Sequence, residues 1–225
     1  MSGYIDIIYS MISILMPIKN GIEFIDESVS SIKEQIYEDW ELIIGINGHD
    51  PESEVFEIAK KYEDEKIRVI HIPDCTSKSY ALNQMVKEAK YEWISLLDVD
   101  DKWKPTKLVF QEMYMKEYDI IGTCAQYFGD MTSTPTLPMG DLQEFNFFSY
   151  NPVINSSCLL KKELCYWDKT WDSIEDYDLW LKLWKQGKKF YNVPSIEVYH
   201  RIHKQSAFNA KGNHLLVDEL KRRYL

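Results

Sequence analysis

Residues 93–101 read Trp93-Ile94-Ser95-Leu96-Leu97-Asp98-Val99-Asp100-Asp101, an apolar run that changes abruptly into acidic residues. An apolar, β-prone run of this length predicts a buried strand of a parallel sheet. Three carboxylates follow at the point where this strand ends. Because ligands of open α/β sheets bind beyond the carboxyl ends of the strands, the acidic turn is a candidate ligand site.

The acidic turn requires a cation, because three neighbouring carboxylates repel one another. A small number of hard oxygen ligands suits Mg²⁺ or Mn²⁺ shared with substrate phosphates. The alternative is a solvated acidic turn with no ligand, since two acids separated by one residue are common. The buried strand before the turn, with Trp103 and Pro105 after it, favours the metal site.

The strand that carries the acids is the fourth in a regular alternation of strands and helices. Apolar runs predict strands at 13–16, ended by Pro17, and at 40–46 and 67–72, while helical spacing predicts helices over 25–36, 55–62 and 82–89. This alternation predicts an α/β fold with a mainly parallel, twisted sheet and right-handed crossovers, flanked by helices.

After Asp101 the pattern is looser. Strands are predicted at 119–128, 153–160 and 196–202, helices at 105–117, 174–186 and 215–225, and a loop over the Thr-, Pro- and Ser-rich residues 129–140. No repeat and no linker interrupts the chain. Residues 1–225 are therefore expected to form a single domain with two lobes, the second smaller than the first.

The net charge of −10 argues against nucleic acid as a partner, because binding a phosphate backbone requires a basic surface. An anionic substrate would need a metal and local cations to offset this charge. The motifs G-x-G-x-x-G, G-x-x-x-x-G-K-[ST] and G-x-S-x-G do not occur in the sequence. Dinucleotide-binding, P-loop and α/β-hydrolase chemistry are therefore not supported.

The four cysteines, none in C-x-x-C spacing, are scattered singly along the chain, which fits a reducing compartment, and we expect a cytoplasmic protein. The apolar residues 11–17 are too few to span a bilayer, so we expect no transmembrane segment. Lys221, Arg222 and Arg223 end the last predicted helix, where cations favour the helix dipole. A contact with a membrane surface or a partner is the alternative role of this basic turn.

Three further groups could carry chemistry. Glu175 and Asp176 open a predicted helix, where a carboxylate could act as general base or could simply stabilise the helix end. Arg201 and His203 follow the last predicted strand, and could bind a phosphate and complete a metal shell, or be ordinary surface polar residues. Lys78 precedes the helix that leads to the acidic strand, and could meet a diphosphate or remain solvated.

These segments together resemble the family 2 glycosyltransferases, which have the GT-A fold. The resemblance is carried by residues 13–20 (SILMPIKN), 35–44 (QIYEDWELII), 78–83 (KSYALN), 97–101 (LDVDD), 175–181 (EDYDLWL) and 201–206 (RIHKQS). The segments occur in the family's order and with its spacing, from about residue 13 to residue 206. The resemblance implies a nucleotide-sugar-binding half at about 11–103 and an acceptor-binding half at about 104–225.

The resemblance implies a hexosyltransferase-type enzyme that moves a sugar from a nucleotide-diphosphate sugar to a hydroxyl of a glycan, lipid or protein-linked acceptor, with inversion. Asp100 and His203 would ligate Mn²⁺ or Mg²⁺, and Asp176, paired with Glu175, would deprotonate the acceptor. The expected contacts of the donor are Pro17, Lys19, Asn20, Asn47, Lys78, Asn83, Asp98, Val99, Asp100 and Arg201.

One position departs from the family. Where the family has Asp-Asp-Gly-Ser after the second strand, this chain has Ile46-Asn47-Gly48-His49, so a neutral amide replaces the acid that contacts the base or ribose. We expect the donor to be a UDP-sugar.

Two other functions remain open at this stage. A sugar-phosphate nucleotidylyltransferase also uses a metal on an α/β sheet, but the chain lacks a Gly-rich phosphate loop. A degenerate, non-catalytic protein that binds a nucleotide-sugar or glycan is disfavoured by the intact Asp98, Asp100, Asp176 and His203.

Overall fold

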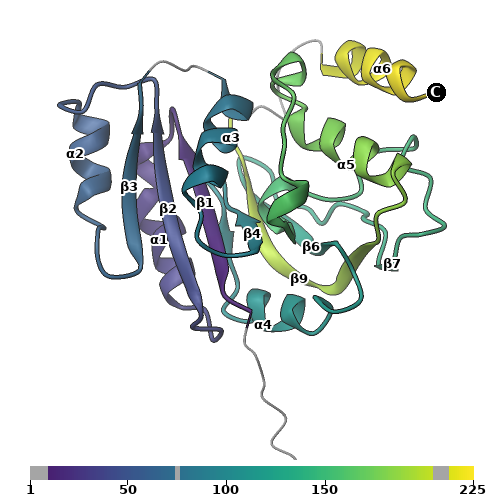
Figure 1. Ribbon diagram of the computed structural model, residues 1–225, viewed down its shortest axis with the longest axis horizontal. Helices are drawn as coiled ribbons and strands as arrows, with labels where there is room; N and C mark the ends of the chain where they lie inside the picture. The colour runs from purple at the N-terminus through teal and green to yellow at the C-terminus, as the bar shows by residue number, and fades with distance from the viewer. Residues whose placement is uncertain (1–9, 74–76, 205–212) are drawn as a thin grey trace, which may run out of the picture.

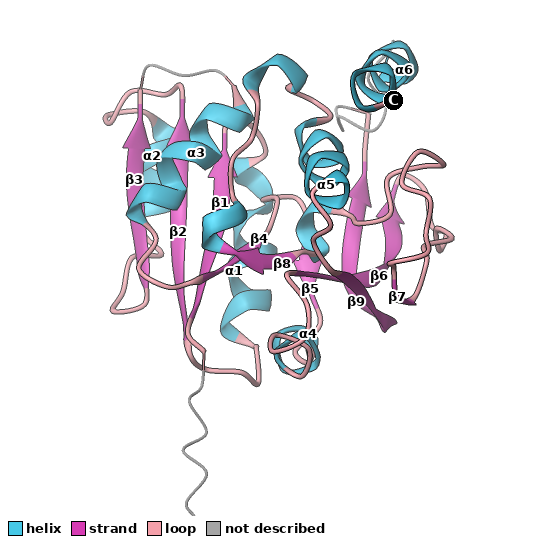
Figure 2. Cartoon of the chain, turned by 45° about the vertical axis from the view of Figure 1, so that its right-hand side comes forward, coloured by secondary structure: helices cyan, strands magenta, loops and turns pink. Residues whose placement is uncertain are grey.

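The computed structural model describes residues 10–73, 77–204 and 213–225, which form a mixed, mostly parallel sheet with helices packed on both faces (Figure 1, Figure 2). Within these residues the sheet has nine strands and runs through both halves of the chain without a break. The predicted α/β class is confirmed.

The first half of the chain contains four parallel strands joined by helices. The strands are β1 (Ile12–Ile18), β2 (Trp40–Asn47), β3 (Ile67–Ile72) and β4 (Trp93–Leu96), and the helices are α1 (Ile25–Lys33), α2 (Glu54–Lys60) and α3 (Lys78–Glu88). A short 3-10 helix, η1 (Ile22–Phe24), precedes α1. β1 lies between β2 and β4, and β3 pairs with the far side of β2. The predicted alternation of strands and helices is confirmed.

The second half extends the same sheet with mixed strand directions. Its elements are β5 (Lys102–Trp103), α4 (Lys107–Glu112), β6 (Ile120–Gly129), β7 (Gly140–Asp141), η2 (Asn155–Ser157), β8 (Leu159–Lys161), η3 (Lys162–Leu164), η4 (Lys169–Trp171), α5 (Glu175–Lys185), β9 (Phe190–Ile202) and α6 (Asn213–Tyr224). The sheet order is β3-β2-β1-β4-β8-β6-β9-β5, with β7 also paired to β9. β8 is antiparallel to β4 and β6, whereas β6 and β9 are parallel.

The strand predicted over 153–160 is wrong in its first part, because strand β8 begins only at Leu159. The residues before it form η2, in which the Ser157 N–H and hydroxyl both donate to the Ile154 carbonyl, at 2.9 and 2.7 Å. This turn brings Asn155 and Ser156 next to the acidic turn after β4.

The prediction that Pro17 ends the first strand is also wrong. β1 continues to Ile18, and Pro17 pairs with Gly45 of β2. β4 pairs with β1 only as far as Leu15, so beyond that point β1 has a neighbour on one side. A residue without an N–H group is tolerated there, as it is on an edge strand.

Two apolar cores lie on opposite faces of the sheet. Leu15 belongs to the core covered by α3 and α5, while its neighbours Ile14 and Met16 belong to the core covered by α1, α2 and α4. This alternation is typical of strands that are buried on both faces. α3 packs closely on β2, since a Cβ atom on Gly45 would lie 2.5 Å from the Met85 sulfur.

Helix α6 packs against α5 through its last turns. Leu220 is buried, the Tyr224 hydroxyl donates to Asp178 at 2.7 Å, and Arg223 pairs with Asp168 at 3.1 Å. Arg223 of the basic turn therefore has a partner on the protein itself. Among the described residues, no helix combines the length and the hydrophobicity that crossing a membrane requires.

One cation is buried inside the second core. Lys107 of α4 is fully buried, with its ammonium 3.0 Å from the Ser95 hydroxyl, 2.8 Å from the Gln111 side-chain oxygen and 3.8 Å from the centre of the Trp103 ring. No carboxylate of the described residues is bonded to it, and burial lowers the pKa of Lys107 to about 7. Holding the charged form in this core opposes folding.

We predict that Lys107→Met removes a pH dependence of stability. Between about pH 7 and 10.5 the unfolded lysine binds a proton that the folded one does not, so wild-type stability gains a contribution as pH rises through this window. The gain should be roughly 1–4 kcal/mol. Urea unfolding at pH 7 and pH 9.5 measures it. An exposed-lysine variant, Lys116→Met, should keep the wild-type slope, and an unchanged slope in Lys107→Met would contradict a depressed pKa.

Candidate functional site

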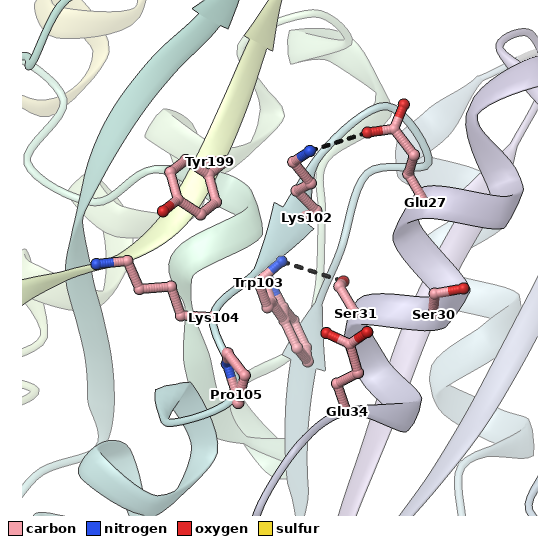
Figure 3. Close-up of a pocket in the computed structure, with 9 residues that line it drawn as sticks. All are labelled: Glu27, Ser30, Ser31, Glu34, Lys102, Trp103, Lys104, Pro105 and Tyr199. Atoms are coloured by element: carbon pink, nitrogen blue, oxygen red, sulfur yellow. Dashed lines mark hydrogen bonds and ion pairs between the residues drawn. The ribbon is translucent and has the colours of Figure 1, made fainter.

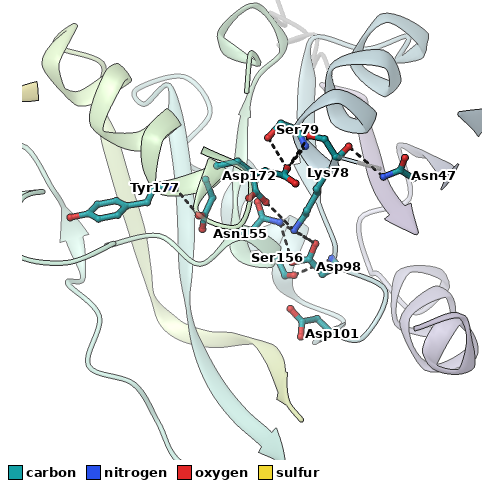
Figure 4. A network of polar contacts seen from close by, with 12 residues as sticks. Asn47, Lys78, Ser79, Asp98, Asp101, Asn155, Ser156, Asp172 and Tyr177 are labelled. Carbon is teal, nitrogen blue, oxygen red and sulfur yellow. Dashed lines mark hydrogen bonds and ion pairs between the residues drawn. The ribbon is translucent and has the colours of Figure 1, made fainter. Parts of the chain in front are cut away.

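The candidate site lies at the carboxyl ends of β1, β2 and β4, where the turn after β4 carries Asp98, Asp100 and Asp101. The first turns of α3 and α5 face this edge of the sheet (Figure 4). Three strand ends and two helix starts therefore meet at the end of the acidic strand, where the site was predicted.

A partly buried lysine joins three of these elements. The Lys78 ammonium, at the start of α3, lies 2.6 Å from Asp98 Oδ1 and 3.4 Å from Glu175 Oε1 at the start of α5. The Asn155 amide donates to both Asp98 oxygens, at 3.2 and 3.1 Å, and the Asp98 N–H donates to the Ser156 hydroxyl at 3.1 Å. Asp98 is thus held by α3 on one side and by η2 on the other.

Nearby charges shift the pKa values of Lys78 and Asp98. Burial alone would lower the pKa of Lys78, but the charges of Asp98 and Glu175 outweigh it and raise the pKa above the usual range. Burial likewise opposes the charge on Asp98, and the ammonium with the Asn155 amide lowers the pKa of Asp98. The lysine and Asp98 are therefore both charged at neutral pH.

The predicted metal ligands lie side by side. Asp100 Oδ2 is 3.0 Å from His203 Nε2, and both side chains are about a quarter exposed, at 24% and 25%. Burial, followed by the charges of Asp101 and Asp98, raises the pKa of Asp100 to about 6. The carboxylates of the turn repel one another, and a bound cation would offset this repulsion.

The donor set fits a divalent cation that is only partly held by protein. Within the described ranges, no cluster of three or more His, Cys, Asp or Glu side chains is arranged to enclose a metal ion. Asp100 and His203 supply one carboxylate and one imidazole. Mg²⁺ and Mn²⁺ accept such ligands and fill their other positions with water and substrate phosphates.

The third carboxylate of the turn has another role. The Asp101 side chain is fully buried, contacts His200 Nδ1 at 2.8 Å and accepts the Arg201 N–H at 2.7 Å. Burial opposes the charge on His200, but Asp101 outweighs it and raises the pKa of His200 to about 9. Asp101 therefore joins the acidic turn to the end of β9, the strand that leads to His203.

The Arg201 guanidinium contacts groups on both sides of the link between the acidic turn and β9. Its Nε donates to the Asp100 carbonyl at 2.9 Å and its Nη2 pairs with Glu27 Oε1 at 2.8 Å. The guanidinium carbon lies 4.4 and 4.3 Å from the ring centres of Phe24 and Phe128. The structure thus places Arg201 beside Asp100 and His203, the predicted metal ligands, with its main contacts to protein groups.

The two acids at the start of α5 differ in their surroundings. Glu175 is buried and directed to Lys78, whereas Asp176 is only partly buried. Asp176 accepts the Asn151 amide at 2.9 Å and the Tyr177 N–H at 2.7 Å. Burial and the charge of Glu175 raise the pKa of Asp176 to about 6. A carboxylate with a raised pKa that remains partly accessible suits a general base.

Asn47 ends β2 with an unused acceptor. The side chain is 2% exposed, its amide donates to the Ser77 carbonyl at 3.3 Å, and its buried Oδ1 has no partner among the described residues. Lys19 and Asn20 are exposed just beyond the end of β1, and the Lys19 carbonyl contacts His49. These residues lie at the edge of the sheet where the candidate site is.

Other predicted donor contacts are placed differently. The Val99 side chain is buried in the core under α1 and packs against Gly21, so only its backbone can face a ligand. Pro17 is partly buried within β1. The Asn83 amide donates to the Trp167 carbonyl at 2.7 Å and accepts the Trp167 N–H at 3.0 Å, so Asn83 joins α3 to the segment before η4.

Asp172 is a residue that sequence reasoning missed. Its Oδ1 accepts the hydroxyls of Ser77 and Ser79, at 3.0 and 3.2 Å, and the Ser79 N–H at 3.2 Å (Figure 4). Ser173, which follows, has a φ of 86°, the left-handed conformation that non-glycine residues rarely adopt. This contact fixes the loop before Glu175 to the start of α3, and no motif in the sequence marks it.

The comparisons agree with this arrangement. Residues 13–162 match the family model described as Glycosyl transferase family 2. The O-antigen biosynthesis glycosyltransferase WbnJ of Escherichia coli is 30% identical over 216 residues, which cover 88% of this chain and 82% of WbnJ. The Escherichia coli UDP-Glc:alpha-D-GlcNAc-diphosphoundecaprenol beta-1,3-glucosyltransferase WfaP is 27% identical over 215 residues, covering 92% and 83% of the two chains.

Solved structures share the fold. S. aureus TarS in complex with UDP-GlcNAc superposes with a TM-score of 0.77 at 14% identity, covering 95% of this chain and 65% of the TarS chain. The mannosyltransferase PcManGT from Pyrobaculum calidifontis, in complex with GDP-Man and Mn²⁺, gives a TM-score of 0.67 at 14% identity, covering 88% and 59%. The predicted GT-A fold is confirmed.

We predict that Asp172→Ala lowers the free energy of unfolding by about 1–3 kcal/mol, because it leaves a set of partly buried donors without their acceptor. Urea denaturation measures the loss. Asp218→Ala removes an exposed carboxylate that makes no hydrogen bond within the described part of the chain, and should leave the midpoint unchanged. Equal midpoints for the two variants would mean that the Asp172 contacts do not hold the loop.

Proposed function

Because this chain belongs to glycosyl transferase family 2, we propose that it transfers a sugar, with inversion, from a UDP-sugar to a hydroxyl of a carbohydrate-bearing acceptor. That it is a nucleotide-sugar glycosyltransferase follows from the family. The observation that supports the specific proposal is the convergence of Lys78, Asp98 and the Asp100–His203 pair with Asp176 at one edge of the sheet.

Departure of the nucleoside diphosphate is the step that needs positive charge. Lys78, held between Asp98 and Glu175, is a cation that α3 fixes at the strand ends. A divalent cation bound by Asp100 and His203 would neutralise the charge that develops on the leaving diphosphate. Because the chain is acidic overall, these local cations are what allow an anionic donor to bind.

Two observations support uridine as the base of the donor. The name of WfaP specifies UDP-Glc, and TarS was solved with UDP-GlcNAc. In this chain the orphaned Oδ1 of Asn47 is an acceptor that the N–H of a uracil ring could satisfy. A neutral amide would then take the place of the family's acid. PcManGT, solved with GDP-Man, shows that the fold also accommodates guanosine, so the base requires a direct test.

Asp176 is our candidate for the base that removes the proton from the acceptor hydroxyl. The WfaP name describes an acceptor sugar linked through diphosphate to undecaprenol. We propose a lipid-linked or otherwise carrier-linked glycan as the acceptor of this chain. One displacement with one base requires no covalent nucleophile, which agrees with the absence of a nucleophile motif.

The family match favours glycosyl transfer over nucleotidylyl transfer. The partly buried Asp176 and the Asp100–His203 pair favour an enzyme over a protein that only binds sugars.

We predict that UDP-sugars are hydrolysed slowly without acceptor in the presence of Mn²⁺, faster than GDP-sugars, and that Asp100→Ala abolishes this activity. A panel of nucleotide sugars, assayed by release of the nucleoside diphosphate, identifies the donor. Chelator should stop the reaction and added Mn²⁺ should restore it. Full activity in excess chelator would contradict metal dependence.

We predict that Asp176→Asn lowers turnover by roughly 10²–10⁴ while donor binding is kept. In the wild type the rate should fall below about pH 6, because protonation of Asp176 removes the base. Glu175→Gln should lose less turnover and more stability, since it leaves the Lys78 ammonium with one partner fewer. Near-normal turnover in Asp176→Asn would exclude this residue as the base.

A further inference from the structure

We propose that Glu27 of α1 is a positioning residue that holds Asp100 and His203 in place for the cation. This inference rests on the proposed metal-dependent transfer. Glu27 lies outside every segment that carries the family resemblance, and it contacts neither of the two ligands itself.

Glu27 joins the two chain segments that carry the ligands. Its Oε2 is 2.9 Å from the Lys102 ammonium, and its Oε1 is 2.8 Å from Arg201 Nη2. Lys102 follows Asp100 by two positions, and Arg201 precedes His203 by two. Figure 3 shows the Glu27–Lys102 pair beside a second link between the same elements, the Trp103 N–H donating to Ser31 of α1.

The contact at Arg201 continues to the ligands. With its guanidinium packed between the Phe24 and Phe128 rings, Arg201 donates from Nε to the Asp100 carbonyl at 2.9 Å. The Phe24 ring also lies 5.7 Å from the His203 ring. Glu27 therefore orients a group that touches the backbone of one ligand and shares an aromatic neighbour with the other.

Glu27 and Asp101 act on different parts of this junction. The buried Asp101 binds the backbone N–H of Arg201 and so fixes the chain. Glu27 instead binds the guanidinium, with its Oε1 2.8 Å from Nη2, and so orients the side chain of Arg201. Without Glu27, the guanidinium would be attracted to the Asp100 carboxylate and would compete with the metal.

The chain offers a matched control directly after the end of the same helix. Glu34 lines the same groove as Glu27, Lys102, Lys104 and Tyr199, a hollow of about 510 Å³ (Figure 3). It is exposed and makes no ion pair within the described ranges. Glu34→Gln removes the same charge from the same surface without touching Lys102 or Arg201.

The test measures Mn²⁺ binding by calorimetry, in the presence of UDP, for the wild type, Glu27→Ala, Glu27→Gln and Glu34→Gln. Removing a group that supports a metal ligand commonly costs 10- to 100-fold in affinity. Since the Glu27 side chain is 48% exposed, we expect the lower end, about 10-fold, for Glu27→Ala. Glu27→Gln should lose less, because it keeps a hydrogen-bond acceptor, and Glu34→Gln should match the wild type.

Amide hydrogen exchange without metal gives a second readout. The amides of residues 98–103 should exchange faster in Glu27→Ala than in Glu34→Gln, while those of α5 should not change. Equal Mn²⁺ affinity and equal exchange in the two variants would overturn the role of Glu27. Tighter metal-free UDP binding in Glu27→Ala would also overturn it, because Arg201 would then serve the diphosphate directly.

The outcomes separate this inference from the proposed function. If the wild type binds no Mn²⁺ and hydrolyses no nucleotide sugar, the metal-dependent function is wrong, and a metal role for Glu27 fails with it. If the wild type binds Mn²⁺ and turns over donor while Glu27→Ala is equal to it in both, only the inference about Glu27 fails.

Discussion

The site depends on one partly buried cation, Lys78, set between Asp98 and Glu175. Each of these three charges would be costly to bury alone, and each is tolerated because the others are present. The lysine stands at the start of α3, Asp98 at the end of β4 and Glu175 at the start of α5. The arrangement of three elements that are distant in sequence is therefore tied to the balance of charge at a single point.

The remaining carboxylates divide into two groups around this point. Asp101 and Asp172 are enclosed by donors and serve the architecture, since their oxygens accept hydrogen bonds from β9 and from α3. Burial and the charges of neighbouring carboxylates raise the pKa values of Asp100 and Asp176 to about 6. Residues of one chemical type, separated by a few positions, thus differ in role because their neighbours differ. Burial and nearby negative charge thus distinguish Asp100, the proposed metal ligand, and Asp176, the proposed general base.

Much of the fold could be predicted from sequence, and the reason is periodicity. Buried parallel strands such as β1 are nearly continuous apolar runs, and amphipathic helices such as α1 repeat with the helical period. The strand prediction was wrong at residues 153–158, because the pattern does not reveal the 3-10 turn that Ser157 holds through the Ile154 carbonyl. In the site, the acidic turn and Glu175-Asp176 were found by motif. Asn155, Asp172 and Glu27 were not, since their importance arises only from contacts across 57, 95 and 174 positions of chain.

The separation of Asp100 and His203 by 103 positions has a consequence for how the protein forms. The first four strands pair through short crossovers, but His203 reaches Asp100 only after β9 has docked beside β6 across the intervening chain. Closing so large a loop is entropically costly and slow compared with local pairing. The first half of the chain can therefore assemble before His203, the second of the two proposed metal ligands, reaches Asp100. A nascent chain that still lacks β9 has the acidic turn without the His203 imidazole. Full affinity for the cation would therefore appear only when folding is complete.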